Sequence, residues 1–263
     1  MTDNLTYPSD LTDEEWNTIK DYFPQEPEKR GPGRIRFQDF RDVFNGILYI
    51  KKTGCQWRYL PKDFPPHNTV NGYFNDWKKS GLYDKILSEL NKMVRLLEGR
   101  NAEPTYGLID SQSVKTVIGG EERGYDGHKK IKGRKRHVIV DILGLLLAVS
   151  VGSAGVHDTK AAGTVMIDAC EKYPSLKAFS GDQGYRKTAE EAALKLNRPM
   201  HISKKIEDKF AVIPKRWVVE RFFAWIGWDR RLSKDYEKTT SSSEAFVKIS
   251  SIKRALNRLS KGK

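Results

Sequence analysis

Three carboxylates occupy places where a folded chain could use them for chemistry. Asp110 lies in Leu-Ile-Asp-Ser-Gln-Ser, Asp182 in Phe-Ser-Gly-Asp-Gln-Gly-Tyr, and Glu220 in Lys-Arg-Trp-Val-Val-Glu-Arg. Carboxylate oxygens are preferred ligands of Mg²⁺. Two such ions, ~3.5–4 Å apart, can activate water or a hydroxyl group for attack on a phosphodiester. The chain has 34 acidic residues, so spacing alone is weak support, and each carboxylate could instead cap a helix or face solvent. Apolar neighbours argue against a merely solvated Glu220.

The order of predicted elements explains how these carboxylates would meet. Strands are predicted at 106–110, 136–142, 145–152, 176–182 and 200–203, and helices at 159–171, 188–196 and 214–232, with a further amphipathic helix at 241–259. This order, in which a strand and a hairpin precede alternating helices and strands, is that of the ribonuclease-H-like fold. That fold is a mixed sheet with helices on both faces. The first and fourth strands are then parallel neighbours, and ligands favour the carboxyl edge of such sheets. Asp110 and Asp182 would lie at that edge, and the last long helix would bring Glu220.

Residues 1–100 show a different pattern, with helical periodicity throughout. Helices are predicted from Thr12, with Glu15 completing a capping box, and over 37–51, 69–79 (capped by Asn68 or Thr69) and 83–98. We therefore expect an α+β protein with an all-helical, helix-turn-helix-like domain (1–100) and a ribonuclease-H-like domain (101–263). The 69–79 helix is the candidate DNA reader, through Asn71, Lys78 and Lys79. A plain helical bundle would give the same periodicity.

Charge points to a polyanionic partner. The net charge is +13, and residues 201–263 carry 16 basic and 7 acidic residues, a net +9. Such an excess is typical of nucleic-acid binding, although it could serve solubility alone. A second cluster lies between Gly127 and Ile142, and the glycines at 127 and 133 predict a flexible loop. Its members are expected to contact DNA or, alternatively, to form a solvated face: Lys129, Lys130, Lys132, Arg134, Lys135 and Arg136.

Other features constrain the class of protein. The two cysteines, Cys55 and Cys170, have no zinc-site spacing. The apolar run from Val138 to Gly152 is interrupted by Asp141 and is too short for a membrane span, which needs ~20 residues. The sequence begins without a signal-peptide pattern. We expect a cytoplasmic protein that does not enter membranes.

Several motifs together resemble one family. They are Leu-Thr-Asp-Glu-Glu-Trp, Gly-Cys-Gln-Trp-Arg-Tyr-Leu-Pro, Thr-Val-Asn-Gly-Tyr-Phe-Asn-Asp-Trp, Ile-Asp-Ser-Gln-Ser, Lys-Gly-Arg-Lys-Arg-His, His-Asp-Thr-Lys-Ala-Ala, Gly-Asp-Gln-Gly-Tyr and Trp-Val-Val-Glu-Arg. In this order, over about residues 5–240, the chain resembles bacterial insertion-sequence transposases of the DDE type, in the insertion sequence five group.

The resemblance implies a catalytic and metal-binding triad of Asp110, Asp182 and Glu220. It implies two Mg²⁺ ions, with Mn²⁺ as a substitute, and action on the terminal inverted repeats of the encoding element and on target DNA by a homodimer or higher oligomer. Related transposases carry Tyr, Arg, Glu and Lys at fixed spacing. Here Arg216 and Glu220 match, whereas Ile213 and Gly227 depart from the pattern.

Two arginines and two further motifs have alternative interpretations. Arg216 and Arg231 are predicted phosphate clamps on the helical face of Glu220, or else plain surface arginines. Asp158, after His157, is expected to cap a helix. The Trp217, Trp225 and Trp228 stripe is expected in the core, or else to stack on bases. Rival functions are a DNA-binding regulator without catalysis and a nuclease of the same fold without strand transfer.

Overall fold

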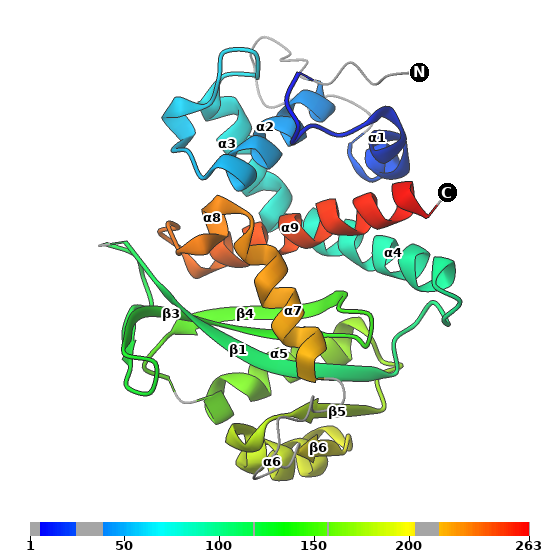
Figure 1. Ribbon diagram of the computed structural model, residues 1–263, viewed down its shortest axis with the longest axis vertical. Helices are drawn as coiled ribbons and strands as arrows, with labels where there is room; N and C mark the ends of the chain where they lie inside the picture. Colours follow the sequence, from blue (N-terminus) through cyan, green and yellow to red (C-terminus); the bar gives the residue numbers. More distant parts are fainter. Residues whose placement is uncertain (1–5, 25–38, 118, 157, 203–215, 263) are drawn as a thin grey trace.

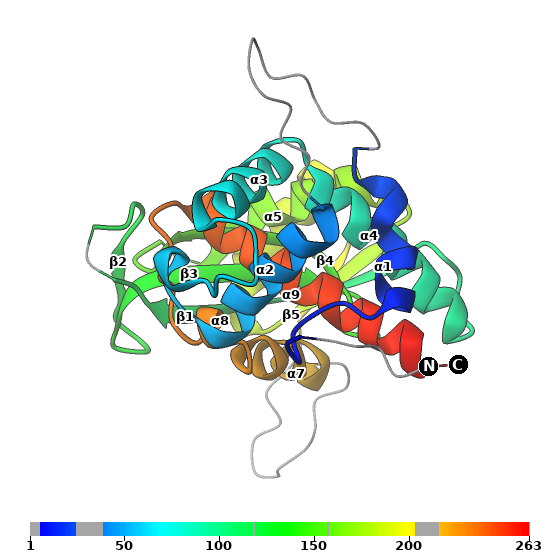
Figure 2. The same ribbon diagram turned by 90° about the horizontal axis from the view of Figure 1, so that it is seen from above.

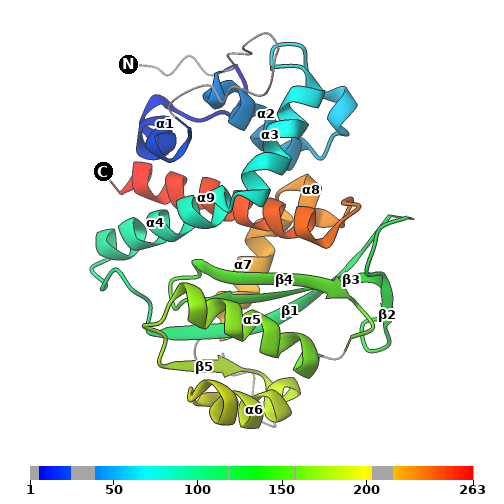
Figure 3. The ribbon, with the colours of Figure 1, turned by 180° about the vertical axis from the view of Figure 1, so that it is seen from behind.

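The computed structural model describes residues 6–24, 39–117, 119–156, 158–202 and 216–262. A layer of helices packs on one side of a mixed sheet, along its outermost antiparallel strand, and further helices cross both of its faces (Figures 1 and 3). The N-terminal helices are α1 (Asp13–Ile19), α2 (Phe40–Thr53), α3 (His67–Lys79) and α4 (Leu82–Leu97). Short 3₁₀ helices are η1 (Lys20–Tyr22), η2 (Trp57–Tyr59) and η3 (Gln183–Tyr185). The prediction of a helical N-terminal region is confirmed.

Local sequence signals set most of these helix ends. Thr12 caps α1, and Glu15 completes the predicted capping box. Asp39 caps α2 by accepting a hydrogen bond from the Arg41 N–H, and Gly54 ends that helix at φ 73°, a left-handed conformation that costs glycine little. The predicted cap of α3 at Asn68 or Thr69 is wrong: α3 begins at His67 after Pro66, without a side-chain cap.

The sheet contains β1 (Tyr106–Lys115), β2 (Gly124–Asp126), β3 (Ile131–Val140), β4 (Leu146–Ser153), β5 (Ala178–Gly181) and β6 (Met200–Ile202). β1 pairs antiparallel with β3 and parallel with β5, and β5 pairs parallel with β6. β4 and β2 both pair antiparallel with β3. The predicted mixed, ribonuclease-H-like order is confirmed, with the short β2 as an addition.

Side chains alternate along the central strands, so they contribute to two separate hydrophobic cores, one on each face of the sheet. Leu108 and Val138 join the core formed by the helical layer, whereas Ile109 and Ile139 join the core under α5 (Asp158–Lys172). α6 (Arg186–Leu196) packs against α5 and β6 at the sheet edge. The face that carries Leu108 is therefore the one that the helical layer covers.

The C-terminal part departs from the predicted long helix at 214–232. The structure has α7 (Arg216–Gly227), a break, and the short α8 (Arg230–Ser233) before α9 (Thr240–Lys261). Asp229 stands in the break, where it accepts a hydrogen bond from Ser250 at 2.6 Å and forms an ion pair with Lys51 at 3.3 Å. These buried contacts with α9 and α2 turn the chain, so the prediction of one continuous helix is wrong.

α9 lies among the N-terminal helices, although it is the last element of the chain. It packs along α4 and also contacts α1, α2, α3 and β4 (Figure 2). Among the described residues, none of the helices is long and apolar enough to cross a membrane.

Candidate active site

Asp110 lies in β1, and Asp182 directly follows β5, the parallel neighbour of β1. Tyr106 pairs with Ala178, Gly107 with Phe179 and Leu108 with Ser180. Continued by two residues, past the end of β5, the same register would set Asp110 opposite Asp182. Gly181 keeps the strands close here, since a Cβ at this residue would stand 2.9 Å from Ile109 Cγ2. The predicted neighbourhood of these two strands is confirmed.

Both aspartates also belong to the same face of the sheet. Side chains alternate along a strand, and Ile109 and Phe179 point into the core under α5. Asp110 and Asp182 therefore belong to the opposite face, with Leu108. α7 packs on β1 and β3 at that face through Val218, Val219 and Phe222. The helix that carries Glu220 covers the face that carries the two aspartates.

Local hydrogen bonds orient the two aspartates. Asp110 Oδ1 accepts from the Ser111 N–H at 2.7 Å, and Asp182 Oδ1 accepts from the Gly184 N–H at 2.9 Å, which caps η3. Both side chains are half-buried, whereas Glu220 is exposed on α7. The carboxylates thus sit at a partly open surface that a large substrate could reach.

The metal prediction can be compared with this placement. Asp110 and Asp182 fit Mg²⁺ by their hard oxygen donors and by their adjacent strands, and Glu220 fits it by donor type. In the described part of the chain, no three His, Cys, Asp or Glu side chains are gathered closely enough to hold a metal ion. The structure thus shows no gathered triad among the described residues, and Glu220 lies on the helix that covers the sheet.

The prediction of a flexible loop for the basic stretch at 129–136 is wrong. Residues 127–130 form a turn, and the rest of the stretch belongs to β3. Gly133 serves packing rather than mobility, because a Cβ there would stand 1.9 Å from the Val114 carbonyl oxygen. Lys129, Lys130 and Lys132 are exposed at this end of the sheet, so these three remain available for DNA contact.

Arg134 and Arg136 are buried at 0% exposure, so as placed they do not reach DNA. Arg134 donates to the carbonyl oxygens of Glu121, Glu237 and Lys238 and pairs with Asp235 at 3.2 Å. Arg136 donates to the Leu232 carbonyl at 2.8 Å. Burial lowers the pKa of Arg136 to about 10. The two arginines fasten the connector between α8 and α9 to β3.

Lys135 is also buried, on the opposite side of β3, where it lies 3.6 Å from Asp126. Burial raises the pKa of Asp126, but hydrogen bonds outweigh it and lower that pKa to about 2. The donors are the Ser113 hydroxyl at 2.5 Å and the N–H groups of His128 and Lys129. Asp126 thus shapes the turn that presents Lys129 and Lys130.

The two predicted phosphate clamps differ in their placement. Arg231 lies in α8 and is only 7% exposed. Its side chain donates hydrogen bonds to the Glu237 carboxylate at 2.6 Å and to the Cys55 carbonyl oxygen at 3.1 Å. Because the helix breaks before it, Arg231 does not return to the face of Glu220, and its prediction as a clamp there is wrong. Arg216 begins α7, one turn before Glu220, but its side chain lies outside the described residues, as do His157 and Ile213.

The candidate DNA reader, α3, is joined to α2 by residues 54–66, longer than the 3–4-residue turn of a helix-turn-helix. Lys79 is exposed and Asn71 is half-buried, accepting a hydrogen bond from the Asn75 side chain at 3.0 Å. Lys78 donates to Ser242 of α9 at 2.9 Å, and burial lowers its pKa. Recognition of DNA by α3 stays a prediction.

The tryptophan stripe on α7 is not a core feature. Trp217 is 44% and Trp228 77% exposed, and Trp225 is half-buried. Sequence analysis missed Arg221, whose guanidinium carbon lies 4.3 Å from the Trp217 ring centre and 4.4 Å from that of Trp225. The sequence does contain a pattern that indicates these contacts, because Trp217, Arg221 and Trp225 are spaced four residues apart and so lie on one flank of a helix.

Comparisons with known proteins agree with this architecture. Residues 101–250 match the family model described as "Transposase DDE domain", and residues 11–87 match "Putative transposase of IS4/5 family". The chain belongs to the transposase DDE domain family. The resemblance noted in the sequence is thereby confirmed.

Curated relatives of this DDE transposase match part of the chain. The "Insertion element IS402 uncharacterized 16.2 kDa protein" of Burkholderia cepacia is 28% identical over 118 residues, 43% of this chain and 78% of that protein. The "Putative transposase for insertion sequence element IS402" of the same organism is 27% identical over 130 residues, 44% of this chain and 60% of that protein. "Uncharacterized protein y4sN" of Sinorhizobium fredii is 28% identical over 106 residues, 40% of this chain and 75% of that protein.

Proposed function

We propose that this transposase cuts phosphodiesters at the ends of its own insertion sequence and joins the freed 3′-hydroxyl to target DNA. The carrying observation is that Asp110 lies in β1 and Asp182 directly follows β5, its parallel neighbour, while α7 packs on β1. The family match over residues 101–250 supports DNA as the substrate. The protein would act on bacterial chromosomal DNA in the cytoplasm, as a homodimer or higher oligomer that holds both element ends.

In this proposal Asp110, Asp182 and Glu220 hold two Mg²⁺ ions, for which Mn²⁺ can substitute. When bound, such ions activate the attacking oxygen and stabilise the leaving oxygen of a phosphodiester. Water attacks phosphorus at the element end, and the phosphorus–oxygen bond to the 3′-oxygen breaks, which frees a 3′-hydroxyl. That hydroxyl then attacks a target phosphorus, and the bond from this phosphorus to the target's 3′-oxygen breaks, which leaves a 3′-hydroxyl on the target strand. The Ser111 and Gly184 N–H groups keep the aspartate oxygens oriented.

DNA contact is assigned to the exposed Lys129 and Lys130 of the β2–β3 turn and Lys132 at the start of β3. Arg216 beside Glu220 and three residues of α3, Asn71, Lys78 and Lys79, would make further contacts. Lysines bind phosphates without reading bases, so the turn would position the duplex. α3 would supply recognition of the terminal inverted repeats.

The test replaces each carboxylate by its amide in the full-length protein: Asp110→Asn, Asp182→Asn and Glu220→Gln. Each variant should lose metal-dependent cleavage of element-end DNA by at least about a hundredfold, while its affinity for that DNA stays within about threefold of wild type. Glu122→Gln, at an exposed residue away from the triad, is the matched control and should cleave normally.

The same assay separates the rival functions. Cleavage without joined products would favour a nuclease, and binding without any cleavage by the wild-type protein would favour a regulator. Wild-type cleavage by one amide variant would remove that carboxylate from the triad.

A further inference from the structure

A ladder of alternating indole and guanidinium groups joins α7 to α9. Arg221 stacks between Trp217 and Trp225, and the Arg254 guanidinium carbon of α9 lies 3.7 Å from the Trp225 ring centre. Arginine over an aromatic face is attracted by the ring quadrupole. The planar guanidinium groups of Arg221 and Arg254 are thus held in fixed orientations by the rings.

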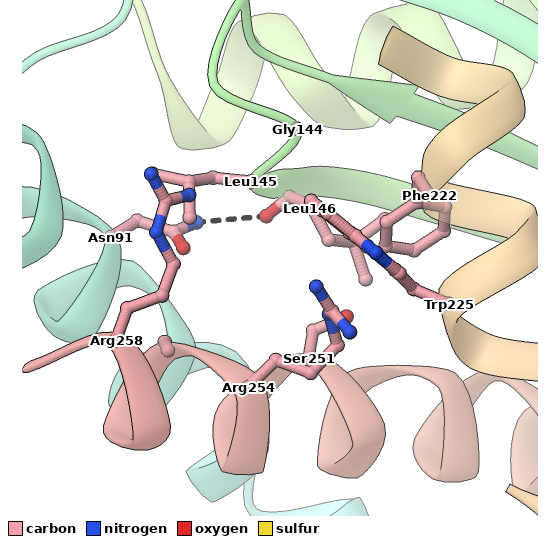
Figure 4. A pocket seen from close by; sticks show the side chains of 10 residues that line it. Asn91, Gly144, Leu145, Leu146, Phe222, Trp225, Ser251, Arg254 and Arg258 are labelled. Carbon is pink, nitrogen blue, oxygen red and sulfur yellow. Dashed lines mark hydrogen bonds between the residues drawn. The ribbon is translucent and has the colours of Figure 1, made fainter. Parts of the chain in front are cut away.

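Two members of the ladder, Trp225 and Arg254, line a small pocket (Figure 4). α7 contributes Phe222 and Trp225, the β3–β4 turn contributes Gly144, and α9 contributes Arg254 and Arg258. Gly144 has φ 80°, and a Cβ there would stand 3.5 Å from Trp225 Cζ3, so the turn backbone approaches the ladder closely. The pocket is built from three elements that are distant in sequence.

The charge of this pocket is not balanced within it. Burial first, and then the charges of Arg258 and Arg221, lower the pKa of Arg254 to about 10 against the opposing effect of Asp229. Asp229 itself is already paired with Lys51 and Ser250. Like charges held together in this way favour an anionic ligand.

Hydrogen-bonding capacity is also unused. Within the described residues, Arg221 Nε is buried and has no hydrogen-bond partner. Arg258 is partly occupied, since it donates to Glu98 at 2.8 Å and to the Leu143 carbonyl at 3.3 Å. Oriented guanidinium groups with free N–H donors match the oxygens of a phosphate.

We propose that Arg254, which lines the pocket between α7, α9 and the β3–β4 turn, and Arg221, which lies next to Gly144 of that turn, together bind a backbone phosphate of DNA. Arg258 adds positive charge at the rim of the pocket. The assignment rests on the proposed function, because it takes its ligand from DNA lying against α7. Arg221 directly follows Glu220, and one helical turn rises about 5.4 Å, so a strand that reaches Glu220 passes close to Arg221. The phosphate site would hold that strand beside the carboxylates.

The test measures the affinity of the full-length protein for duplex DNA at several salt concentrations. Arg254→Gln and Arg221→Gln should each bind about tenfold more weakly at low salt. For each DNA phosphate that a variant no longer neutralises, the slope of log affinity against log salt should become shallower by roughly 0.9. Arg100→Gln, at an exposed arginine after α4, is the matched control and should keep the wild-type slope.

Thermal unfolding of every variant shows whether it folds. Arg254→Lys keeps the charge, so its slope of log affinity against log salt should be closer to that of the wild type than the slope of Arg254→Gln. If the glutamine variant is unfolded, Arg254→Lys replaces it in the test. A wild-type slope and affinity in folded Arg221→Gln and Arg254→Gln would overturn the phosphate site while leaving the proposed function intact.

A second arm separates DNA from free phosphate. Inorganic phosphate that stabilises the wild type but not Arg254→Gln, together with unchanged DNA slopes, would show a site for a free anion and overturn the DNA assignment. Absence of DNA binding by the wild type would overturn the proposed function itself and this inference with it.

Discussion

The position of the Asp182 carboxylate depends on the glycine before it. A Cβ at Gly181 would stand 2.5 Å from Met200 Cε, 2.9 Å from Ile109 Cγ2 and 3.1 Å from Tyr185 Cδ2. These atoms belong to the two strands beside β5 and to η3. Any side chain at residue 181 therefore pushes β5 away from its neighbours, and Asp182 moves with it.

Gly181→Ala should lower the free energy of unfolding by about 1–3 kcal/mol, the usual cost of overpacking, and should reduce cleavage further than the stability loss explains. Gly152→Ala in β4 is the control, because nothing lies within 4 Å of a Cβ there, and it should stay within about 0.5 kcal/mol. Urea unfolding and cleavage rates measure both effects. Equal stability of the two variants would mean that β5 has room to shift.

At the scale of elements, β3 separates lysines that face solvent from arginines that hold the fold. Lys132 is exposed. Arg134, two residues later, donates hydrogen bonds to three carbonyl oxygens and forms an ion pair with Asp235. Removing one partner of a buried ion pair leaves an uncompensated charge, which costs about 3–5 kcal/mol. The same type of substitution should therefore have opposite consequences at these two residues.

Arg134→Met should destabilise the protein by about 3–5 kcal/mol in urea unfolding. Lys132→Met should leave stability unchanged and weaken DNA binding, with a salt slope shallower by roughly 0.9 if Lys132 makes one phosphate contact. A stable Arg134→Met variant with weak DNA binding would reverse these assignments and return Arg134 to the DNA surface.

β3 also shows why the sequence predicted some features and not others. The parallel neighbourhood of Asp110 and Asp182 follows from element order, which local patterns reveal. The loop prediction failed because a glycine in a turn, such as Gly127, cannot be told in sequence from a glycine that close packing requires. Gly133 is of the second kind, because the backbone of Val114 leaves no room for a Cβ there. The burial of Arg134 depends on carbonyl groups about a hundred residues away, and no local pattern encodes such a partner.

The break between α7 and α8 has the same origin. Lys51 and Ser250 are far from Asp229 in sequence, yet their contacts interrupt what reads as one helix. The stacked Trp217, Arg221 and Trp225 could have been found from their four-residue spacing alone. Arg254, which completes the ladder from α9, could not.

At the scale of the whole molecule, α9 ties both ends of the chain together. Phe246, Ile249 and Ile252 belong to one continuous core with side chains of α2, α3 and α4 and with the helix-covered face of the sheet. The division at residue 100 stays a prediction about folding units. The shared core favours a single cooperative unit, since the helices of residues 1–100 bury their apolar faces on α9 and β4.

Ile249→Ala tests this cooperativity. Ile249 is 0% exposed in the middle of α9, and truncation of a buried isoleucine to alanine costs about 2–5 kcal/mol. If the core is one unit, far-ultraviolet circular dichroism and tryptophan fluorescence should follow a single unfolding transition, displaced equally by the substitution. Lys261→Ala, exposed at the end of the same helix, should leave the transition in place. Two separate transitions, of which Ile249→Ala moved only one, would show that the helical layer and the sheet fold independently, and residues 1–100 would then be worth testing alone for recognition of the element ends.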